Sequence, residues 1–216
     1  MNSLDTSSSR RMFHAPRVLF VLFLAILAVG LAVQWRDAGA SPALAYAMVG
    51  LYTAWVLYEA PITFQASTTM KETRTLLPYG LARGAVMAAT LCAPHAAAPL
   101  PLSALGLLLF VAGVLMREIA IKTLGRFYTH HVARRTDQVA VTTGLYRAIR
   151  HPAYCGMLVA HVGLVLAFPT PLAALCLALL FAAVIRRILV EERVLWDMPG
   201  YAEYARAKPR LLPGIW

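Results

Sequence analysis

Hydrophobic residues are gathered into four long blocks that contain no Asp, Glu, Lys or Arg. A helix that spans a bilayer needs about 20 mostly apolar residues. The first two blocks are each long enough for one such helix, and the last two are each long enough for two. The blocks are Val18 to Gln34, Ala38 to Tyr58, Gly84 to Met116 and Pro152 to Ile185.

Prolines divide both long blocks near their middle, at Pro94 to Pro101 and at Pro169 to Pro171. Proline ends or kinks a helix because it lacks an N–H and clashes with the preceding turn. The fifth predicted helix is short and reaches only about 24 Å, so the last two helices could form a hairpin that does not cross fully. The sequence thus predicts an all-α, polytopic membrane bundle of five to six transmembrane helices, at about 17–35, 42–64, 78–94, 101–121, 153–168 and 171–190.

Composition agrees with a membrane protein and excludes several other classes. Of the 216 residues, 60% are hydrophobic and 14% are charged, whereas soluble domains have about 45–50% and about 25%. These values exclude a disordered chain and an ordinary cytosolic domain. A net charge of +10 in so apolar a chain indicates contact with membrane lipids and no nucleic-acid partner.

The basic residues also predict an orientation in the membrane. With six spans, 19 of the 20 Lys and Arg residues belong to segments or helix ends on one side, and only Arg36 lies on the other. Because loops rich in Lys and Arg stay in the cytoplasm, both termini are predicted to be cytoplasmic. In a bacterium, the protein would lie in the inner membrane.

The N-terminal region allows a second interpretation. Arg10, Arg11 and Arg17 precede an apolar run, and Ala38-Gly39-Ala40 resembles a cleavage site, as in a signal peptide. The apolar run is long for a signal peptide and further spans follow it, so we favour a first transmembrane helix preceded by a flexible tail at residues 1–16. The three cysteines, Cys92, Cys155 and Cys176, lie in apolar segments without paired spacing, which predicts neither a disulfide framework nor a zinc site.

Candidate chemistry lies in two polar segments, 117–151 and 186–216. His151-Pro152 would begin the fifth helix, because proline suits a first helical turn, and free N–H groups at such a terminus favour an anionic ligand. The alternative is an interfacial histidine without a ligand. Gly144 interrupts the chain before a short helix predicted to begin at Tyr146.

The sixth helix carries charges at its inner end. Arg187 and Glu191 are four residues apart and share one helical face, whereas Glu192 points elsewhere. A carboxylate there needs a partner or water, so the pattern indicates either interfacial salt bridges or a polar cofactor pocket closed by the C-terminal segment. Glu59, before Pro61, could line a cavity or face the interface.

The remaining histidines are less informative. His161, within the fifth helix, is expected to be a hydrogen-bonded interior residue. The adjacent His130 and His131 would diverge in a helix or a strand, so we predict no metal site there.

The motif Arg150-His151-Pro152-Ala153-Tyr154, followed by an apolar hairpin and Glu191-Glu192, resembles the signature of the isoprenylcysteine carboxyl methyltransferase family. Phospholipid methyltransferases and other small membrane methyltransferases look like distant relatives. The resemblance covers about residues 105–216. It includes Gly125 to His130, Val141 to Tyr146, Gly200-Tyr201-x-x-Tyr204 and Leu212-Pro213.

The resemblance implies methyl transfer from S-adenosylmethionine to a lipophilic acceptor that enters from the bilayer, with a cofactor pocket at the cytoplasmic face. By motif position it implies that Arg187 is the substrate-side catalytic residue and that Glu191 binds a cationic or hydroxyl part of the cofactor. The other cofactor residues it implies are Gln138, Val139, Ala140, Val141, Tyr146, His151, Pro152, Ala153 and Tyr154.

The chain departs from the family pattern at two of these positions. Ala140 stands where a leucine is usual, and Gln138 stands where the longer relatives have histidine. The physical chemistry agrees with methyl transfer all the same, because attack of an anionic acceptor on a sulfonium needs alignment and exclusion of water rather than an acid–base set.

The resemblance also implies a division of the chain. Residues 17–100 would form N-terminal transmembrane helices, and residues 101–216 a methyltransferase core with a cofactor loop at 122–154 and a C-terminal cap at 191–216. Alternatives are a phospholipid N-methyltransferase, a thiol S-methyltransferase, an NADPH-dependent reductase of the sterol type, or a non-enzymatic membrane protein. The oligomeric state is left open.

Overall fold

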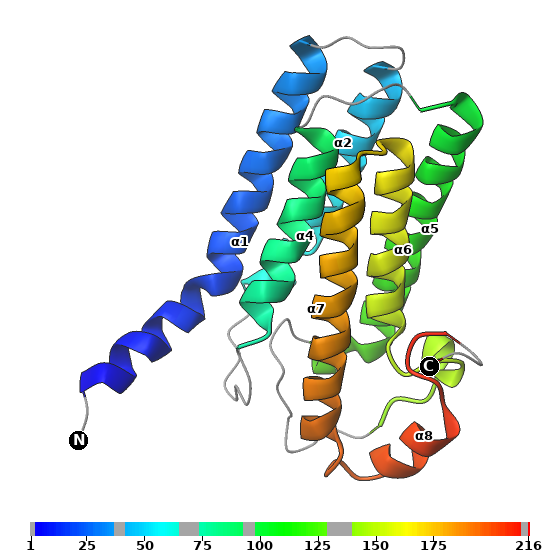
Figure 1. Cartoon of the computed structure of the whole chain (residues 1–216). Coiled ribbons are helices and arrows are strands. Elements are labelled where there is room, and N and C mark those ends of the chain that lie inside the picture. The colour runs from blue at the N-terminus through cyan, green and yellow to red at the C-terminus, as the bar shows by residue number, and fades with distance from the viewer. Residues whose placement is uncertain (1–2, 37–41, 65–73, 93–97, 129–139, 213–215) are drawn as a thin grey trace.

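The described residues form a bundle of six long helices in this computed structural model (Figure 1). The structure describes residues 3–36, 42–64, 74–92, 98–128, 140–212 and 216, and these contain no β-strand. The six helices are α1 (Ser3–Arg36), α2 (Pro42–Tyr58), α4 (Leu76–Leu91), α5 (Leu100–Leu124), α6 (Pro152–Ala167) and α7 (Pro171–Leu195).

The long helices alternate in direction along the chain, and both termini therefore lie at the same end of the bundle (Figure 1). Four short elements lie at that end or close to it. They are α3 (Ala60–Thr63), the 3₁₀ helices η1 (Gly125–Phe127) and η2 (Gly144–Arg147), and α8 (Tyr201–Ala207). The prediction of an all-helical bundle is confirmed for the described residues, and each predicted helix matches an observed one within a few residues, apart from the differences described below.

The predicted helix at 42–64 is interrupted at Glu59, which separates α2 from α3. The physical reason is Pro61, which has no N–H for the hydrogen bond that a continuous helix needs. The chain turns there instead, and the Glu59 carbonyl accepts bonds from Ile62 N–H and Thr63 N–H, both at 3.1 Å.

The N-terminus differs from expectation, because α1 begins at Ser3 and so includes most of residues 1–16, which were expected to form a tail outside the helix. Pro16 lies inside this helix, and Figure 1 shows a bend in its N-terminal part. An internal proline bends a helix without ending it when the turns on both sides remain helical. The C-terminal end of α7 likewise continues to Leu195, past the predicted end at 190, and α4 ends at Leu91, three residues before it.

Within the part of the chain that the structure describes, three segments are long and apolar enough to cross a membrane, namely Ala15–Arg36, Leu100–Phe127 and Pro171–Leu195. The apolar helices at Ala43–Tyr58, Leu76–Leu91 and Pro152–Ala167 are shorter. Large apolar side chains also face outward, for example Leu108 at 65% and Val21 at 65% exposure. An outer surface of this kind suits contact with lipid.

Glycines allow α5 and α6 to pack with their backbones in close approach. Gly106 and Gly113 on α5 face Gly156 and Gly163 on α6. A Cβ atom on Gly156 would lie 2.6 Å from the Gly113 carbonyl oxygen, and one on Gly106 would lie 2.6 Å from that of Gly163. Small residues are the usual means of close helix association in membranes. By contrast, α7 packs mainly against α4 rather than against its hairpin partner α6.

The interior histidine behaves as predicted. His161 is fully buried, its Nδ1 lies 2.7 Å from the Met157 carbonyl oxygen, and its Nε2 lies 2.8 Å from the Tyr52 hydroxyl. All three cysteines are free, Cys155 and Cys176 being buried and Cys92 half-buried.

Candidate active site

The motif at the start of α6 is shaped by a glycine and a proline. Gly144 has a φ of +56°, a left-handed conformation that glycine adopts without steric cost, and it opens the 3₁₀ turn that contains Tyr146. His151 then occupies the position before the first helical residue, Pro152. The predicted helix start is confirmed.

The C-terminal segment returns to this helix start. Arg150 N–H donates to the Pro209 carbonyl at 2.9 Å, and His151 N–H donates to the Arg210 carbonyl at 3.0 Å. The Tyr204 hydroxyl, from α8, donates to the Tyr146 carbonyl at 2.8 Å. These bonds satisfy backbone groups in a stretch that has no regular hydrogen-bond partners of its own. The segment therefore covers the motif.

Glu192 joins these parts through its carboxylate, which is buried. Its Oε1 lies 2.7 Å from Arg150 Nη1 and 3.1 Å from His151 Nε2, and its Oε2 lies 2.9 Å from Arg210 Nε. A buried carboxylate is tolerated only with such partners. The interpretation as salt bridges at the end of the sixth helix thus holds for Glu192.

Arg187 and Glu191 meet through a third residue, Tyr154. Arg187 Nε–H donates to the Tyr154 oxygen at 2.8 Å, and the Tyr154 hydroxyl donates to Glu191 Oε2 at 2.7 Å. Hydrogen bonds to charged groups at both ends hold the phenol in one orientation. The structure therefore brings together three of the predicted site residues, from α6 and α7, in one chain of hydrogen bonds.

Two residues that were not selected from the sequence also join this group, namely Tyr79 of α4 and Thr75, which directly precedes α4. Arg187 Nη1 donates to Thr75 Oγ1 at 3.1 Å. The Tyr79 ring centroid lies 5.4 Å from the Arg187 guanidinium carbon and 6.2 Å from the Tyr154 ring. Both belong to the N-terminal half, where no motif marks them, so only the packing of α4 against α7 identifies them.

The structure describes some of the other predicted cofactor residues. Ala140, Val141, Tyr146 and Ala153 pack in one apolar cluster together with Tyr201 of α8. His151 is buried, and its ring lies 5.8 Å from that of Tyr154. Gln138, Val139, His130 and His131 lie outside the described residues.

The tyrosines of this cluster are neutral at physiological pH. Burial raises the pKa of Tyr204 to about 12, and it raises the pKa of Tyr146 and of Tyr201 as well. Such phenols donate hydrogen bonds and offer aromatic faces, but they do not act as bases near pH 7. The described residues also include no group of three metal-ligating side chains.

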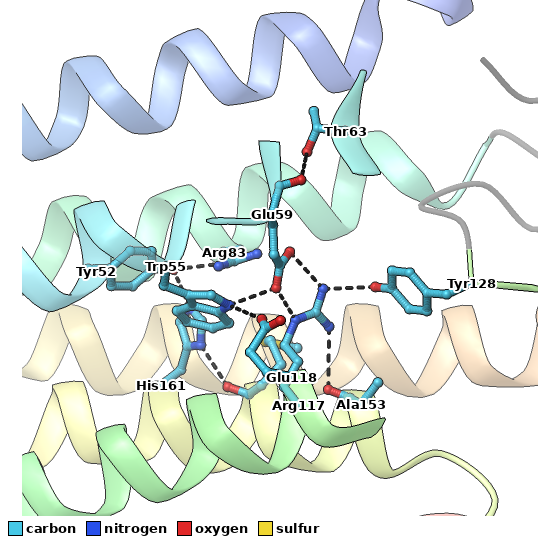
Figure 2. Close-up of polar contacts among 11 residues, drawn as sticks. Tyr52, Trp55, Glu59, Thr63, Arg83, Arg117, Glu118, Tyr128, Ala153 and His161 are labelled. Carbon is cyan, nitrogen blue, oxygen red and sulfur yellow. Dashed lines mark hydrogen bonds and ion pairs between the residues drawn. The ribbon is translucent and has the colours of Figure 1, made fainter. Parts of the chain in front are cut away.

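A second group of buried charges contacts the backbone of Ala153 (Figure 2). Arg117 of α5 binds Glu59 through Nε to Oε1 at 2.6 Å and through Nη2 to Oε2 at 3.0 Å. The same guanidinium donates to the Ala153 carbonyl at 3.4 Å and to the Tyr128 hydroxyl at 2.9 Å. Glu59 was noted in the sequence, but Arg117 was not recognised as its partner, because 58 residues separate them.

Three of the basic residues that were assigned to the predicted cytoplasmic side are buried. Arg83, Arg117 and Arg187 were counted as helix-end charges on the cytoplasmic side, yet their side chains are 6%, 1% and 3% exposed. Each is engaged with groups inside the bundle. The charge asymmetry therefore depends on the other basic residues.

Comparison with known proteins links the C-terminal half to one family. Residues 104–197 match the sequence pattern of the isoprenylcysteine carboxyl methyltransferase family. Protein-S-isoprenylcysteine O-methyltransferase B of Arabidopsis thaliana is 34% identical over 119 residues, which are 53% of this chain and 60% of the relative. Cobalt-zinc-cadmium resistance protein CzcN of Cupriavidus metallidurans is 36% identical over 107 residues, 46% of this chain and 48% of the relative.

The matched segment thus spans about half to three fifths of the length of these relatives. A solved structure of a eukaryotic intramembrane Ras methyltransferase of the same family is similar over 99% of this chain and 88% of that one. Its TM-score is 0.54 at 21% identity, which shows a shared fold that includes the N-terminal helices.

Proposed function

Because residues 104–197 match the sequence pattern of the isoprenylcysteine carboxyl methyltransferase family, we propose that this membrane protein transfers a methyl group from S-adenosylmethionine to a lipophilic acceptor. The observation that carries the proposal is the hydrogen-bonded group of Arg187, Tyr154 and Glu191. It unites the two halves of the family motif, which are separated in sequence by the α6–α7 hairpin.

The residues present fit the proposed methyl donor. The donor has ribose hydroxyls and an ammonium group, which a carboxylate such as Glu191 can bind, and an adenine ring, which suits an aromatic and apolar surround. Tyr146, Ala153 and Tyr201 supply that surround. The Tyr201 hydroxyl is buried and lacks a hydrogen-bond partner in the described part of the chain, so a polar group is available there for a ligand.

We assign the roles by motif and by these contacts. Glu191, Tyr154, His151 and Pro152 would line the donor pocket, with Ala153, Tyr146 and the segment of Gln138, Val139, Ala140 and Val141 forming its remaining wall. When bound, S-adenosylmethionine supplies a methyl group on a sulfonium. The chain itself aligns the two reactants, excludes water and neutralises the acceptor's charge.

Arg187 is the proposed substrate-side residue. In the structure its Nη1 donates to a neutral hydroxyl, that of Thr75. A guanidinium binds a carboxylate through paired charge-assisted bonds, which are about twice as strong as bonds to a neutral acceptor. An acceptor carboxylate would therefore displace the hydroxyl and be held beside Tyr154. The acceptor class proposed is an isoprenylcysteine-type carboxylate or a similar lipid.

The membrane arrangement is part of the proposal. Six helices would span the bilayer, with both termini and the donor pocket on the cytoplasmic side and the acceptor approaching between helices. Residues 1–16 precede the first span, 17–100 would form the N-terminal helices, and 101–216 would form the methyltransferase core. Even alternation of the six helices supports placement of both termini on one side (Figure 1).

The test combines binding with turnover. Purified protein should bind radiolabelled S-adenosylmethionine and methylate one member of a panel of prenylcysteine carboxylates, fatty acids, amine phospholipids and alkyl thiols. Arg187→Ala should abolish methylation and largely spare donor binding, whereas the matched control Arg186→Ala, at an exposed position on the same helix, should act as the parent does. Binding of a reduced nicotinamide in place of the methyl donor would indicate a reductase. If the protein bound neither compound, a non-enzymatic role would be indicated.

A further inference from the structure

A cavity lies between α1, the α2–α3 junction and α4, and it is lined by none of the residues proposed for the donor pocket. Its empty volume is about 510 Å³, including the part open to solvent. Most of its walls are apolar. The apolar lining residues include Leu19, Phe20, Phe23, Val56, Leu76 and Gly80, and the polar ones are Glu59, Thr63, Tyr79 and Arg83.

Arg83 is the charged group of this cavity that has no ion-pair partner in the described part of the chain. Its side chain is 94% buried, being 6% exposed. Nε donates to the Tyr52 hydroxyl at 2.9 Å, but neither Nη atom makes a hydrogen bond or an ion pair with a described residue. The guanidinium carbon lies 4.2 Å from the Trp55 ring centroid, a cation–π contact that leaves the edge donors unused.

The orientation of Arg83 follows from the residues behind it. His161 Nδ1 faces a carbonyl oxygen, that of Met157, and must donate to it. The neutral ring then accepts at Nε2 from the Tyr52 hydroxyl at 2.8 Å, which leaves the Tyr52 oxygen to accept from Arg83 Nε. Arg83 is thereby held at its Nε edge by Tyr52 (Figure 2), and the residue lines the cavity.

The carboxylates nearby do not neutralise Arg83 by direct contact. Glu59 lines the same cavity, but both of its oxygens bind Arg117, and Oε1 also accepts from Trp55 Nε1 at 2.7 Å. Glu118 accepts from the other side of Trp55, at 3.1 Å. A cation inside a membrane protein is costly unless it is paired or bound to a ligand.

We propose that this cavity binds an anionic amphiphile, with its oxyanion head on Arg83 and its hydrocarbon chain along the walls formed by α1 and α4. The planar guanidinium suits a carboxylate or a phosphate oxyanion, and the apolar walls suit a lipid chain. The occupant could be a free acid or a bilayer lipid, which share this chemistry. Binding in this cavity requires no methyl donor and does not depend on the proposed reaction.

Tyr79 would connect this site with the candidate active site. It lines the cavity, and its ring also contacts Arg187 and Tyr154. An occupant of the cavity would therefore lie one aromatic ring away from the group proposed to hold the acceptor.

The experiment measures quenching of Trp55 fluorescence in phosphatidylcholine nanodiscs. The protein carries Phe at the other three tryptophans, Trp35, Trp196 and Trp216, and the probes are spin-labelled stearate and its uncharged methyl ester. The acid should quench Trp55 saturably, at a concentration at least about tenfold lower than the ester requires, as expected for a charge-assisted bond. Arg83→Gln should remove this preference, and Arg83→Lys should keep much of it.

Two further variants keep the result interpretable. Gly80→Leu would crowd the cavity wall, because Leu19 Cδ2 lies 2.9 Å from a Cβ at this position and must shift. The variant should weaken quenching by both probes with Arg83 intact. Arg36→Gln, at an exposed arginine of α1, should change nothing. Adding phosphatidylglycerol would displace the acid if a bilayer lipid is the natural occupant and would leave it bound if a free acid is. Equal quenching by acid and ester, or an acid preference that survives Arg83→Gln, would overturn the inference.

Discussion

Two buried carboxylates, Glu59 and Glu192, each bind arginine, but they join different parts of the chain. Glu192 connects α7 to the start of α6 and to the C-terminal segment, all within the region that matches the family or follows it closely. Glu59 connects the α2–α3 junction to Arg117 of α5. It therefore ties the N-terminal half, which carries no recognisable motif, to the half that does.

The two clusters also differ in their contact with water. Arg117 and Glu59 have side chains 1% and 5% exposed, whereas Arg210, one of three partners of Glu192, is 27% exposed. Removal of one charge from a dry pair leaves the other without compensation, but a partly wet cluster can replace a lost partner with water. The Glu59–Arg117 pair, which joins the N-terminal half without a recognisable motif to the half that has one, is therefore less tolerant of a lost charge than the Glu192 cluster.

The largest effect is expected for Arg117→Ala. This change leaves Glu59 buried without its bidentate partner and should destabilise the protein by about 3–5 kcal/mol. Thermal unfolding in detergent measures it. The double variant Glu59→Gln with Arg117→Met should recover part of the loss, and Arg193→Ala, at an exposed position, serves as control. A loss no larger than that control's would show that the pair contributes nothing.

Glu192→Gln should lower the stability of the whole protein less than Arg117→Ala does, and its effect should be concentrated at the start of α6. The loss of charge weakens three bonds at the start of α6 and should cost about 1.5–3 kcal/mol. We expect the C-terminal segment to detach first, which hydrogen exchange at Arg150 and His151 amides would detect, because these donate to Pro209 and Arg210. If exchange rose equally in α2 and α5, the two clusters would not be separable.

Gly156→Ala tests the helix contact that lies between the clusters. The added Cβ would lie 2.6 Å from the Arg117 backbone nitrogen and from the Gly113 carbonyl. Rigid backbone atoms cannot move aside as a side chain can, so α5 and α6 must separate at a cost of about 1–3 kcal/mol. Gly50→Ala, where a Cβ would meet nothing within 4 Å, is the matched control in the same unfolding assay. Equal melting temperatures for both would exclude close α5–α6 packing.

Tyr204→Phe should have the smallest effect, about 1 kcal/mol. It removes only the hydroxyl that donates to the Tyr146 carbonyl at 2.8 Å and faces that of Ile149 at 3.2 Å. Since these residues shape the proposed donor pocket, affinity for S-adenosylmethionine should fall a few-fold while the melting temperature changes little. A calorimetric titration measures the affinity, and an unchanged value would show that α8 does not shape the pocket.

Local sequence patterns predicted most of the helices. The apolar blocks and their prolines located α4, α5, α6 and α7 within a few residues, and Gly144 with His151-Pro152 marked the turn and helix start beside the motif. The i, i+4 relation of Arg187 and Glu191 was also visible. Their connection through Tyr154 was not, because a hydroxyl on one helix can bridge two residues of another only after the helices pack.

The sequence pattern could not predict which residues the buried charges contact. Arg83 and Arg117 looked like helix-end residues, since a sequence shows how far a charge lies from a loop but not what lies opposite it. The apolar blocks, the six helices and the family motif follow from the order of residues along the chain, because helix formation and membrane partition depend on near neighbours. Tertiary packing alone decided which charges are buried together, which glycines face each other, and that Arg83 lines a cavity. Each of these depends on the approach of helices that are distant in sequence.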